Sequence, residues 1–240
     1  AREQLGAYPD VTIRDEEACS AAVTPEGFAV ELASGQRLAA RTLLLATGVV
    51  DAIPPIDGME RFYGRTVHHC PYCDGWEHRD KPLAVYGCGD TGARYALAMT
   101  RWSADIVLCT DGFPGISPEL TAELNRHGIA VRDEKIRSLE GSGDRLECIV
   151  FAEGPPLARS AIFFCTSQRQ RSGLAADLGC HFTEDGAVAT ERAETTNVPG
   201  LFVAGDASKD AQLVIVAASE GAQAAVAINT LLTQQDLSVR

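Results

Sequence analysis

Three glycines between a strand-like run and a helix-like run restrict the fold of this chain more than any other feature. The apolar run 83–86 is followed by Gly87, Gly89 and Gly92, then by a helical pattern and a second apolar run at 105–109. This order predicts a βαβ unit, in which Gly87 permits a tight turn, Gly89 lets the backbone approach a pyrophosphate and Gly92 allows close packing of helix on strand. A plain glycine turn is the alternative, but the flanking runs favour a dinucleotide-binding loop.

Three further side chains belong to this predicted nucleotide site. Asp90 and Thr91 lie inside the glycine loop, and Asp111 lies nineteen residues after Gly92, near the spacing at which an acid holds an adenosine ribose. A carboxylate at that strand end would repel the 2′-phosphate of NADPH, and the segment 109–112 contains no basic residue. We therefore expect NADH or NADPH as the electron donor, and the absence of any nicotinamide stays open as a third option.

A cysteine pair precedes the glycine loop. Cys70 and Cys73 are three residues apart, and Asp74 follows them directly. A dithiol beside a dinucleotide loop is what a nicotinamide-linked disulfide oxidoreductase needs, because a thiol–disulfide couple exchanges two electrons. The spacing alone is weak evidence, since a chain with eight cysteines produces such pairs by chance. Most of the other cysteines look like small core residues.

His68, His69 and His78 lie near the cysteine pair in the sequence. A structural zinc site would need two ligands besides the cysteines, but the chain has no second pair of this spacing, and we predict no metal. His68 or His69 could instead lower the pKa of an attacking thiol. Alternatively, these histidines could be ordinary surface residues.

Charge and hydropathy restrict the partners and the compartment. The formal net charge of -12 argues against a nucleic-acid binder, because such proteins need clustered lysine and arginine. We expect no apolar stretch of the roughly 18 to 20 residues that span a bilayer, and the first residues lack a signal-peptide pattern. We expect a cytoplasmic protein that binds neither nucleic acid nor membrane.

Apolar runs and turn residues outline the remaining organisation. Residues 11–14, 28–32 and 41–46 read as strands separated by Gly, Pro and Ser. Pro54-Pro55 marks a redirection of the chain, so we place a domain crossing between Val49 and Ala52.

Together, these motifs resemble those of the low-molecular-weight thioredoxin reductase family of flavoproteins. The resemblance covers nearly the whole chain and rests on four ordered motifs, at 46–48, 70–75, 87–92 and 198–206. It implies an α/β, two-domain flavoprotein disulfide reductase fold, in which a Rossmann-like nucleotide-binding domain is inserted into an FAD-binding domain. The implied domains are 1–50 and 166–240 for FAD, and 51–165 for NAD(P) and the cysteine pair.

The resemblance also implies roles for individual residues. Cys73 would face the flavin, Cys70 would exchange with the substrate, and Asp74 would donate and accept the proton, although Asp74 could also be a solvated turn residue. The implied flavin-binding residues are Thr47, Gly48, Gly205, Asp206 and Gln212. For Asp206 the alternative is a helix cap, and for Gln212 it is a surface amide.

The chain departs from the family pattern at its start. Family members begin with a strand and a glycine loop for the ADP half of FAD, and no such motif precedes residues 46–48 here. We expect that one βαβ unit, at least ~30 residues, is absent from this sequence. The chain alone would then hold FAD poorly.

Three functions remain open at this level. We expect a thioredoxin-reductase-like enzyme, active as a homodimer, that passes electrons from a nicotinamide through FAD to the Cys70/Cys73 pair and on to a thioredoxin-like protein or a small disulfide. The second possibility is an FAD-dependent oxidase of small dithiols that uses oxygen. The third is a non-catalytic regulatory protein that binds flavin or nucleotide.

Overall fold

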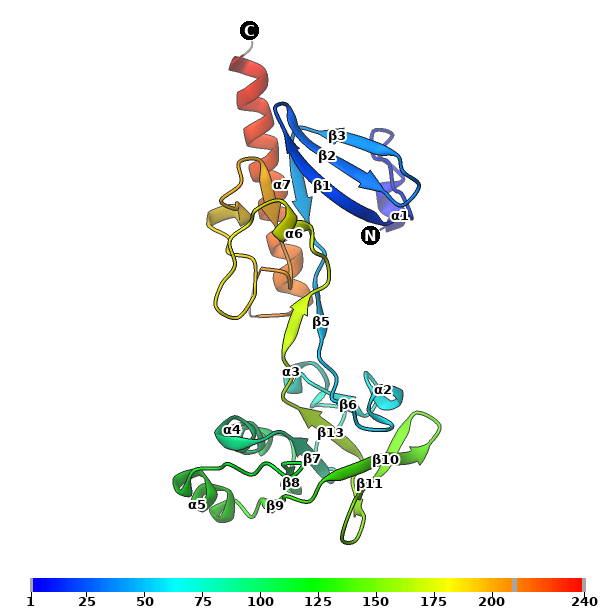
Figure 1. Ribbon diagram of the computed structural model, residues 1–240, viewed down its shortest axis with the longest axis vertical. Helices are drawn as coiled ribbons and strands as arrows, with labels where there is room; N and C mark the ends of the chain where they lie inside the picture. The colour runs from blue at the N-terminus through cyan, green and yellow to red at the C-terminus, as the bar shows by residue number, and fades with distance from the viewer. Residues whose placement is uncertain (1, 209–210, 239–240) are drawn as a thin grey trace. The chain divides into compact units, whose positions relative to one another are not determined.

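The computed structural model describes residues 2–208 and 211–238 and divides into two compact units. Unit 1 consists of Ala1–Val50 and Gln168–Arg240, and unit 2 of Asp51–Ser167. The chain therefore leaves unit 1 once and returns once. At these two places the strands β5 (Val49–Asp51) and β14 (Gln168–Gln170) pair with each other as a two-stranded sheet (Figure 1).

A five-stranded parallel sheet forms the centre of unit 2, with strand order β6-β13-β7-β8-β9. Strands buried on both faces are expected to be continuously apolar, and all four residues of β8 and of β13 are buried. The strands are β6 (Val67–His68), β7 (Leu83–Tyr86), β8 (Ile106–Cys109), β9 (Ala130–Arg132) and β13 (Ala161–Phe164).

The two faces of this sheet are covered by different elements. Leu83 and Val85 pack in one core with α4 (Gly89–Met99) and α5 (Pro118–Arg126), whereas Ala84 packs in the other core with an antiparallel sheet. This alternation follows from the period of two along a strand. The second core also contains α2 (Met59–Phe62), and its sheet has the order β10 (Ile136–Ser142), β11 (Arg145–Phe151) and β12 (Leu157–Ala158).

Parallel pairing of β13 with both β6 and β7 decides where the predicted motifs lie. Phe163 is opposite His68 on one side and Val85 on the other. The carboxyl ends of β6 and β7 therefore reach the same edge of the sheet. The cysteine pair follows β6 through the short helix α3 (Pro71–Asp74), and the glycine loop follows β7.

Unit 1 combines an antiparallel sheet, a short parallel pair and a long helix. The antiparallel sheet contains β1 (Ala18–Thr24), β2 (Gly27–Leu32) and β3 (Arg37–Ala40), and β4 (Leu43–Leu45) pairs in parallel with β15 (Leu201–Val203). The helical segments are α1 (Arg2–Leu5), α6 (Leu174–Asp177), a 3-10 turn at Arg192–Glu194 and α7 (Val214–Ser238).

Most of the predicted local elements are confirmed, and one is wrong. The expected α/β class with a parallel sheet is present, and the runs 28–32, 83–86 and 105–109 form β2, β7 and β8. The strand predicted at 11–14 is wrong, because these residues are exposed and have no regular structure. An apolar alternation too short to pack against a core does not by itself make a strand.

Helix α7 corrects the expectation about apolar stretches. In the described part of the chain it is the single helix long and apolar enough to cross a membrane, and 11% of its most apolar window is buried. Its 25 residues contain only two charged side chains, Glu220 and Asp236. Length and composition alone are weak evidence for a membrane span, because core helices of other proteins pass the same test.

The buried sheet of unit 2 predicts a specific loss of stability. Replacement Leu108→Ala removes a side chain with 0% exposure from β8, and should lower the free energy of unfolding by about 2 to 5 kcal/mol. The control Val131→Ala, at a residue 37% exposed on β9, should cost about 1 kcal/mol or less. Both tryptophans, Trp76 and Trp102, lie in unit 2, so tryptophan fluorescence in a urea titration reports this unit. Equal midpoints for the two variants would contradict the layered core.

Candidate functional site

The cysteine pair lies at the start of a single helical turn. Cys70 immediately precedes α3, Pro71 is its first residue, and one turn brings Cys73 back next to Cys70. The two cysteines form a disulfide, with their Cα atoms 5.4 Å apart. Cys73 is exposed and Cys70 is half-buried. The disulfide is therefore accessible from solvent at the Cys73 end.

Asp74 is held beside two buried histidines. Its Oδ2 atom lies 3.3 Å from Nδ1 of His68, and Nε2 of His68 lies 3.1 Å from Nε2 of His78. Both rings are over nine-tenths buried, so the interpretation of His68 as a surface residue is wrong. Burial lowers the pKa of His68, and the nearby Asp74 carboxylate opposes this shift. Burial is also the largest cause of a lowered pKa at His78, and the electrostatic effect of the neighbouring His68 lowers it further.

A second polar cluster fixes the segment just before Cys70. The Tyr63 hydroxyl donates to Asp51 and lies 3.0 Å from Nδ1 of His69, and the Tyr95 hydroxyl donates to the His69 carbonyl at 2.8 Å. Burial, with the hydrogen bond to Asp51, raises the pKa of Tyr63, so its hydroxyl stays protonated. Sequence reasoning missed Tyr63 and Asp51, because neither belongs to a recognisable motif.

The glycine loop has the geometry that a dinucleotide requires. A Cβ atom on Gly92 would come within 2.5 Å of the Gly87 carbonyl carbon and oxygen, so only glycine lets α4 approach β7 this closely. Gly89 opens α4 with a positive φ of 59°. The loop lies where the chain reverses its direction across the sheet, with β13 on one side of β7 and β8 on the other. Ligands of open α/β sheets bind at such switch points.

The acidic residues of this predicted site have partners within the protein. Asp90 Oδ1 accepts a hydrogen bond from the Ser117 amide at 2.8 Å, which lowers the pKa of that carboxyl. Asp111 Oδ1 accepts from the Ile136 amide at 2.7 Å, and Tyr86 donates to its Oδ2 at 3.4 Å. Thr91 is exposed on α4. The assignment of Asp111 to a ribose stays a prediction.

The predicted flavin residues meet at one strand edge of unit 1. Because β4 and β15 are parallel, their carboxyl ends bring Thr47 and Gly48 together with Gly205 and Asp206. Gly48 and Gly205 have φ values of 67° and 80°, a conformation that favours glycine, and without a side chain they leave the backbone open to a close ligand. The Gly205 amide donates to Glu220 of α7 at 2.7 Å. This buried glutamate, which sequence reasoning missed, holds the turn against the helix.

Gln212 lies just before α7 and pairs with another amide side chain. Gln168 Nε2 donates to Gln212 Oε1 at 2.7 Å, and a reciprocal hydrogen bond joins the other two atoms. Gln212 is half-buried. The structure thus places Gln212 at the start of α7 but gives it a protein partner, and its contact with a flavin stays a prediction.

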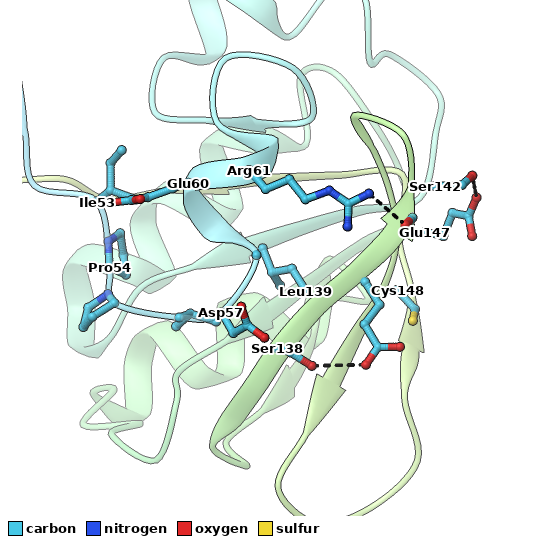
Figure 2. Close-up of a pocket in the computed structure, with 15 residues that line it drawn as sticks. Ile53, Pro54, Asp57, Glu60, Arg61, Ser138, Leu139, Ser142, Glu147 and Cys148 are labelled. Atoms are coloured by element: carbon cyan, nitrogen blue, oxygen red, sulfur yellow. Dashed lines mark hydrogen bonds between the residues drawn. The ribbon is translucent and has the colours of Figure 1, made fainter.

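A groove elsewhere in unit 2 is separate from all of these residues. It has a volume of about 1100 Å³ and lies between the segment 53–61 and the hairpin of β10 and β11 (Figure 2). Arg61 donates to the Gly143 carbonyl at 2.6 Å, and Ser138 donates to Glu140 at 3.3 Å. None of the predicted site residues lines this groove, so it is not part of the candidate site.

Comparisons with known proteins identify relatives of the whole arrangement. The family described as pyridine nucleotide-disulphide oxidoreductase matches residues 9–221. The bifunctional thioredoxin reductase/thioredoxin of Mycobacterium leprae is 29% identical, over 89% of this chain and 48% of that protein. The chain spans about half to two thirds of the length of the curated relatives that it matches.

Solved structures agree with this family. TrxB from Bacillus anthracis, assigned as a thioredoxin reductase, has a TM-score of 0.91 at 28% identity, over 98% of this chain and 79% of that one. HlmI has a TM-score of 0.92 at 33% identity, over 99% of this chain and 76% of that one. The resemblance stated from the sequence motifs, and the fold that it implied, are therefore confirmed.

The environments of the cysteines predict which thiols react. Burial raises the pKa of Cys109 to about 12 and that of Cys165 to about 11, so few of these thiols ionise at pH 8 and thiolate is the reactive form. Iodoacetamide should modify the exposed Cys19 and Cys88 at least about tenfold faster than it modifies these two buried thiols. Peptide mass spectrometry measures the four rates. Modification of Cys165 as fast as Cys88 would contradict the packing of this thiol against Gly87.

Proposed function

The chain belongs to the pyridine nucleotide-disulphide oxidoreductase family, and we propose that it is a disulfide reductase of the thioredoxin reductase type. In this proposal electrons pass from a nicotinamide dinucleotide through FAD to the Cys70–Cys73 disulfide and then to a substrate disulfide. The observation that carries the proposal is the disulfide followed by Asp74 in the same unit as a glycine loop at a sheet switch point. The comparisons do not favour the oxidase or the non-catalytic alternative.

The nicotinamide dinucleotide would bind at the carboxyl end of β7. The turn from Gly87 to Gly92 would receive the pyrophosphate, because its glycines leave no side chain between backbone and ligand. Asp111, at the carboxyl end of β8, would hold the adenosine ribose. A carboxylate at that position repels a 2′-phosphate, so the proposal favours NADH over NADPH.

FAD would bind along the carboxyl edge of β4 and β15. Thr47 and Gly48 end one strand, Gly205 and Asp206 end the other, and Gln212 precedes α7. The two glycines have positive φ angles that other residues rarely adopt, and they carry no side chain at this edge. Asp206 would offer a carboxylate to a ribityl hydroxyl. When bound, the flavin takes a hydride from the nicotinamide and supplies an electron pair to a disulfide.

The cysteines and Asp74 divide the thiol chemistry. Cys73 is the exposed member of the disulfide, and it would face the flavin. Cys70 would attack the substrate disulfide as a thiolate. Asp74 would donate the proton that a departing thiolate takes up and would accept it back in the reverse direction.

The substrate and the assembly belong to the same proposal. The curated relative in Mycobacterium leprae carries thioredoxin in its own name, which supports a thioredoxin-like protein as the oxidant for the Cys70/Cys73 dithiol. A small-molecule disulfide is the other member of this substrate class. We further propose that the enzyme works as a homodimer, as expected from the family.

An anaerobic titration tests the proposal and identifies the donor. Addition of NADH to the flavin-loaded protein should bleach the flavin absorbance. NADPH should reach the same bleaching only at a concentration at least about tenfold higher, because the Asp111 carboxylate disfavours the extra phosphate. In Cys73→Ser, NADH should still bleach the flavin, but reduction of a disulfide substrate should be lost. Bleaching by a small dithiol and by neither nucleotide would overturn the proposal in favour of a dithiol oxidase.

The close approach of Gly92 to Gly87 predicts a loss of nucleotide binding. Gly92→Ala places a Cβ within 2.5 Å of the Gly87 backbone, which displaces the turn and should weaken NADH binding at least about tenfold. The control is Gly221→Ala, in α7 of unit 1, where a Cβ meets nothing within 4 Å. The readout is NADH protection of Cys88 from iodoacetamide. Equal protection in both variants would exclude this loop as the nucleotide site.

A further inference from the structure

The backbone amide of Gly89, in the proposed nucleotide loop, already has a partner within the protein. It donates a hydrogen bond to the Pro114 carbonyl at 2.8 Å. Gly89 is the first residue of α4, and the first amides of a helix have no acceptor inside that helix. Cys88, the residue before α4, gives these amides no side-chain acceptor within the described chain. The start of α4 therefore takes an acceptor from Pro114, a residue that follows β8.

The segment that contains Pro114 also touches Gly89 directly. A Cβ atom on Gly89 would lie 3.6 Å from the Gly115 carbonyl oxygen, and a Cβ on Gly115 would lie 3.8 Å from the Gly89 Cα atom. The two backbones are thus in van der Waals contact. We call residues 112–115 the strap. It lies against the glycine that lets a backbone approach a pyrophosphate in this type of loop.

The strap is fixed at both ends and exposed in between. Before it, the Asp111 carboxylate accepts a hydrogen bond from the Ile136 amide at 2.7 Å. After it, Ile116 packs against the core that α4 and α5 share with the sheet. All four residues of the strap are exposed, and the Phe113 side chain has 73% exposure. Outward movement of the strap therefore uncovers little buried surface.

Two glycines determine the backbone conformation of the strap. Gly112 has a φ of 89° and Gly115 a φ of 47°, and both values lie in the left-handed region that glycine adopts without steric cost. A Cβ atom on Gly112 would meet no described atom within 4 Å. At Gly112, a side chain would thus strain the backbone of the strap without a clash against its neighbours.

The strap and a pyrophosphate need the same hydrogen-bond donor. In the proposed function, a dinucleotide places its pyrophosphate at the turn from Gly87 to Gly92, where amides at the start of a helix bind phosphate oxygens. The Gly89 amide has one hydrogen, and the Pro114 carbonyl accepts it. The carbonyl and a phosphate oxygen would therefore compete for this amide.

We propose that the strap is an autoinhibitory cover of the dinucleotide site, which must move away from Gly89 before a pyrophosphate can bind there. The inference rests on the proposed function and adds the regulation of its nucleotide site. The dissociation constant that is measured for a dinucleotide then equals the intrinsic one divided by the fraction of molecules whose strap is open. A change that destabilises the closed strap should consequently tighten binding.

Gly112→Ala tests this consequence, because alanine disfavours the φ of the closed strap and touches nothing else. The matched control is Gly143→Ala, in the hairpin of β10 and β11, where φ is 59° and a Cβ again meets no described atom within 4 Å. The probe is NAD⁺, which carries the pyrophosphate but cannot reduce the flavin. Isothermal titration calorimetry of the flavin-loaded protein measures its dissociation constant.

We expect Gly112→Ala to lower the dissociation constant for NAD⁺ at least about threefold, and Gly143→Ala to leave it unchanged. Unchanged binding in Gly112→Ala would overturn the proposal, since the strap would then not compete with the ligand. Weaker binding in Gly112→Ala alone would also overturn it, because the closed strap would then belong to the binding site.

Hydrogen exchange of the Gly89 amide measures the opening of the strap without any nucleotide. A protected amide exchanges in the molecules whose hydrogen bond is open. Gly112→Ala should therefore accelerate exchange at Gly89 by about the factor by which it lowers the dissociation constant for NAD⁺. Equal exchange rates in the wild type and in Gly112→Ala would contradict the closed strap.

A measurement on the unaltered chain keeps the test independent of any variant. NMR detects the scalar coupling that passes through a hydrogen bond, here between the Gly89 nitrogen and the Pro114 carbonyl carbon. We expect this coupling in the nucleotide-free protein and its loss at saturating NAD⁺. A coupling that persists in the NAD⁺ complex would overturn the strap as a cover.

The outcomes separate the strap from the proposed function. If NAD⁺ binds, NADH bleaches the flavin and the Gly89–Pro114 coupling persists, the strap proposal fails and the proposed function stands. If neither the wild type nor Gly112→Ala binds NAD⁺, and NADH does not bleach the flavin, the proposed function fails and the strap proposal fails with it.

Discussion

The parallel pairing of β13 with two strands is the constraint on which the rest of unit 2 depends. Because Phe163 is opposite both His68 and Val85, β6 and β7 end at the same edge of the sheet. The segment that follows β6 carries the disulfide, and the turn that follows β7 carries the glycines. Two motifs separated in sequence are thereby brought to one edge by backbone hydrogen bonds alone. The same pairing packs Phe163 against the rings of His68 and His78.

Both units use one structural device at the carboxyl ends of paired parallel strands. In unit 2 a glycine with positive φ, Gly89, follows β7, and in unit 1 Gly48 and Gly205 follow the paired strands β4 and β15. Parallel strands direct their carboxyl ends to one side, and glycine keeps that side clear of side chains. Unit 1 adds Glu220, whose carboxylate accepts from the Gly205 amide and ties the turn to α7. The open strand edges of both units thus follow from strand direction and glycine more than from any particular side chain.

Sequence reasoning succeeded where a feature is local and failed where it is not. The glycine loop, β7, β8 and the disulfide spacing are local patterns, and the structure contains each of them. The hydrogen bond from the Ile136 amide to Asp111 joins residues 25 positions apart, and no periodicity reports such a contact. Glu220 reads as one polar residue of an apolar helix until the Gly205 amide is found beside it. The strand prediction at 11–14 was wrong for the opposite reason. Its apolar pattern is local, but these residues are exposed and pack against no core.

Two histidine rings, His68 and His78, are buried in unit 2, and their burial is tolerable only because their ring atoms have partners. A buried imidazole costs free energy unless its ring atoms have partners, and a charged one costs more. Burial accordingly lowers the pKa of His68 and of His78, and this favours the neutral form of both rings. Neutral rings in contact must then order their hydrogens, and the Arg65 carbonyl fixes that order at His68. The same contacts make burial of the two rings tolerable and place His68 against Asp74, next to the disulfide.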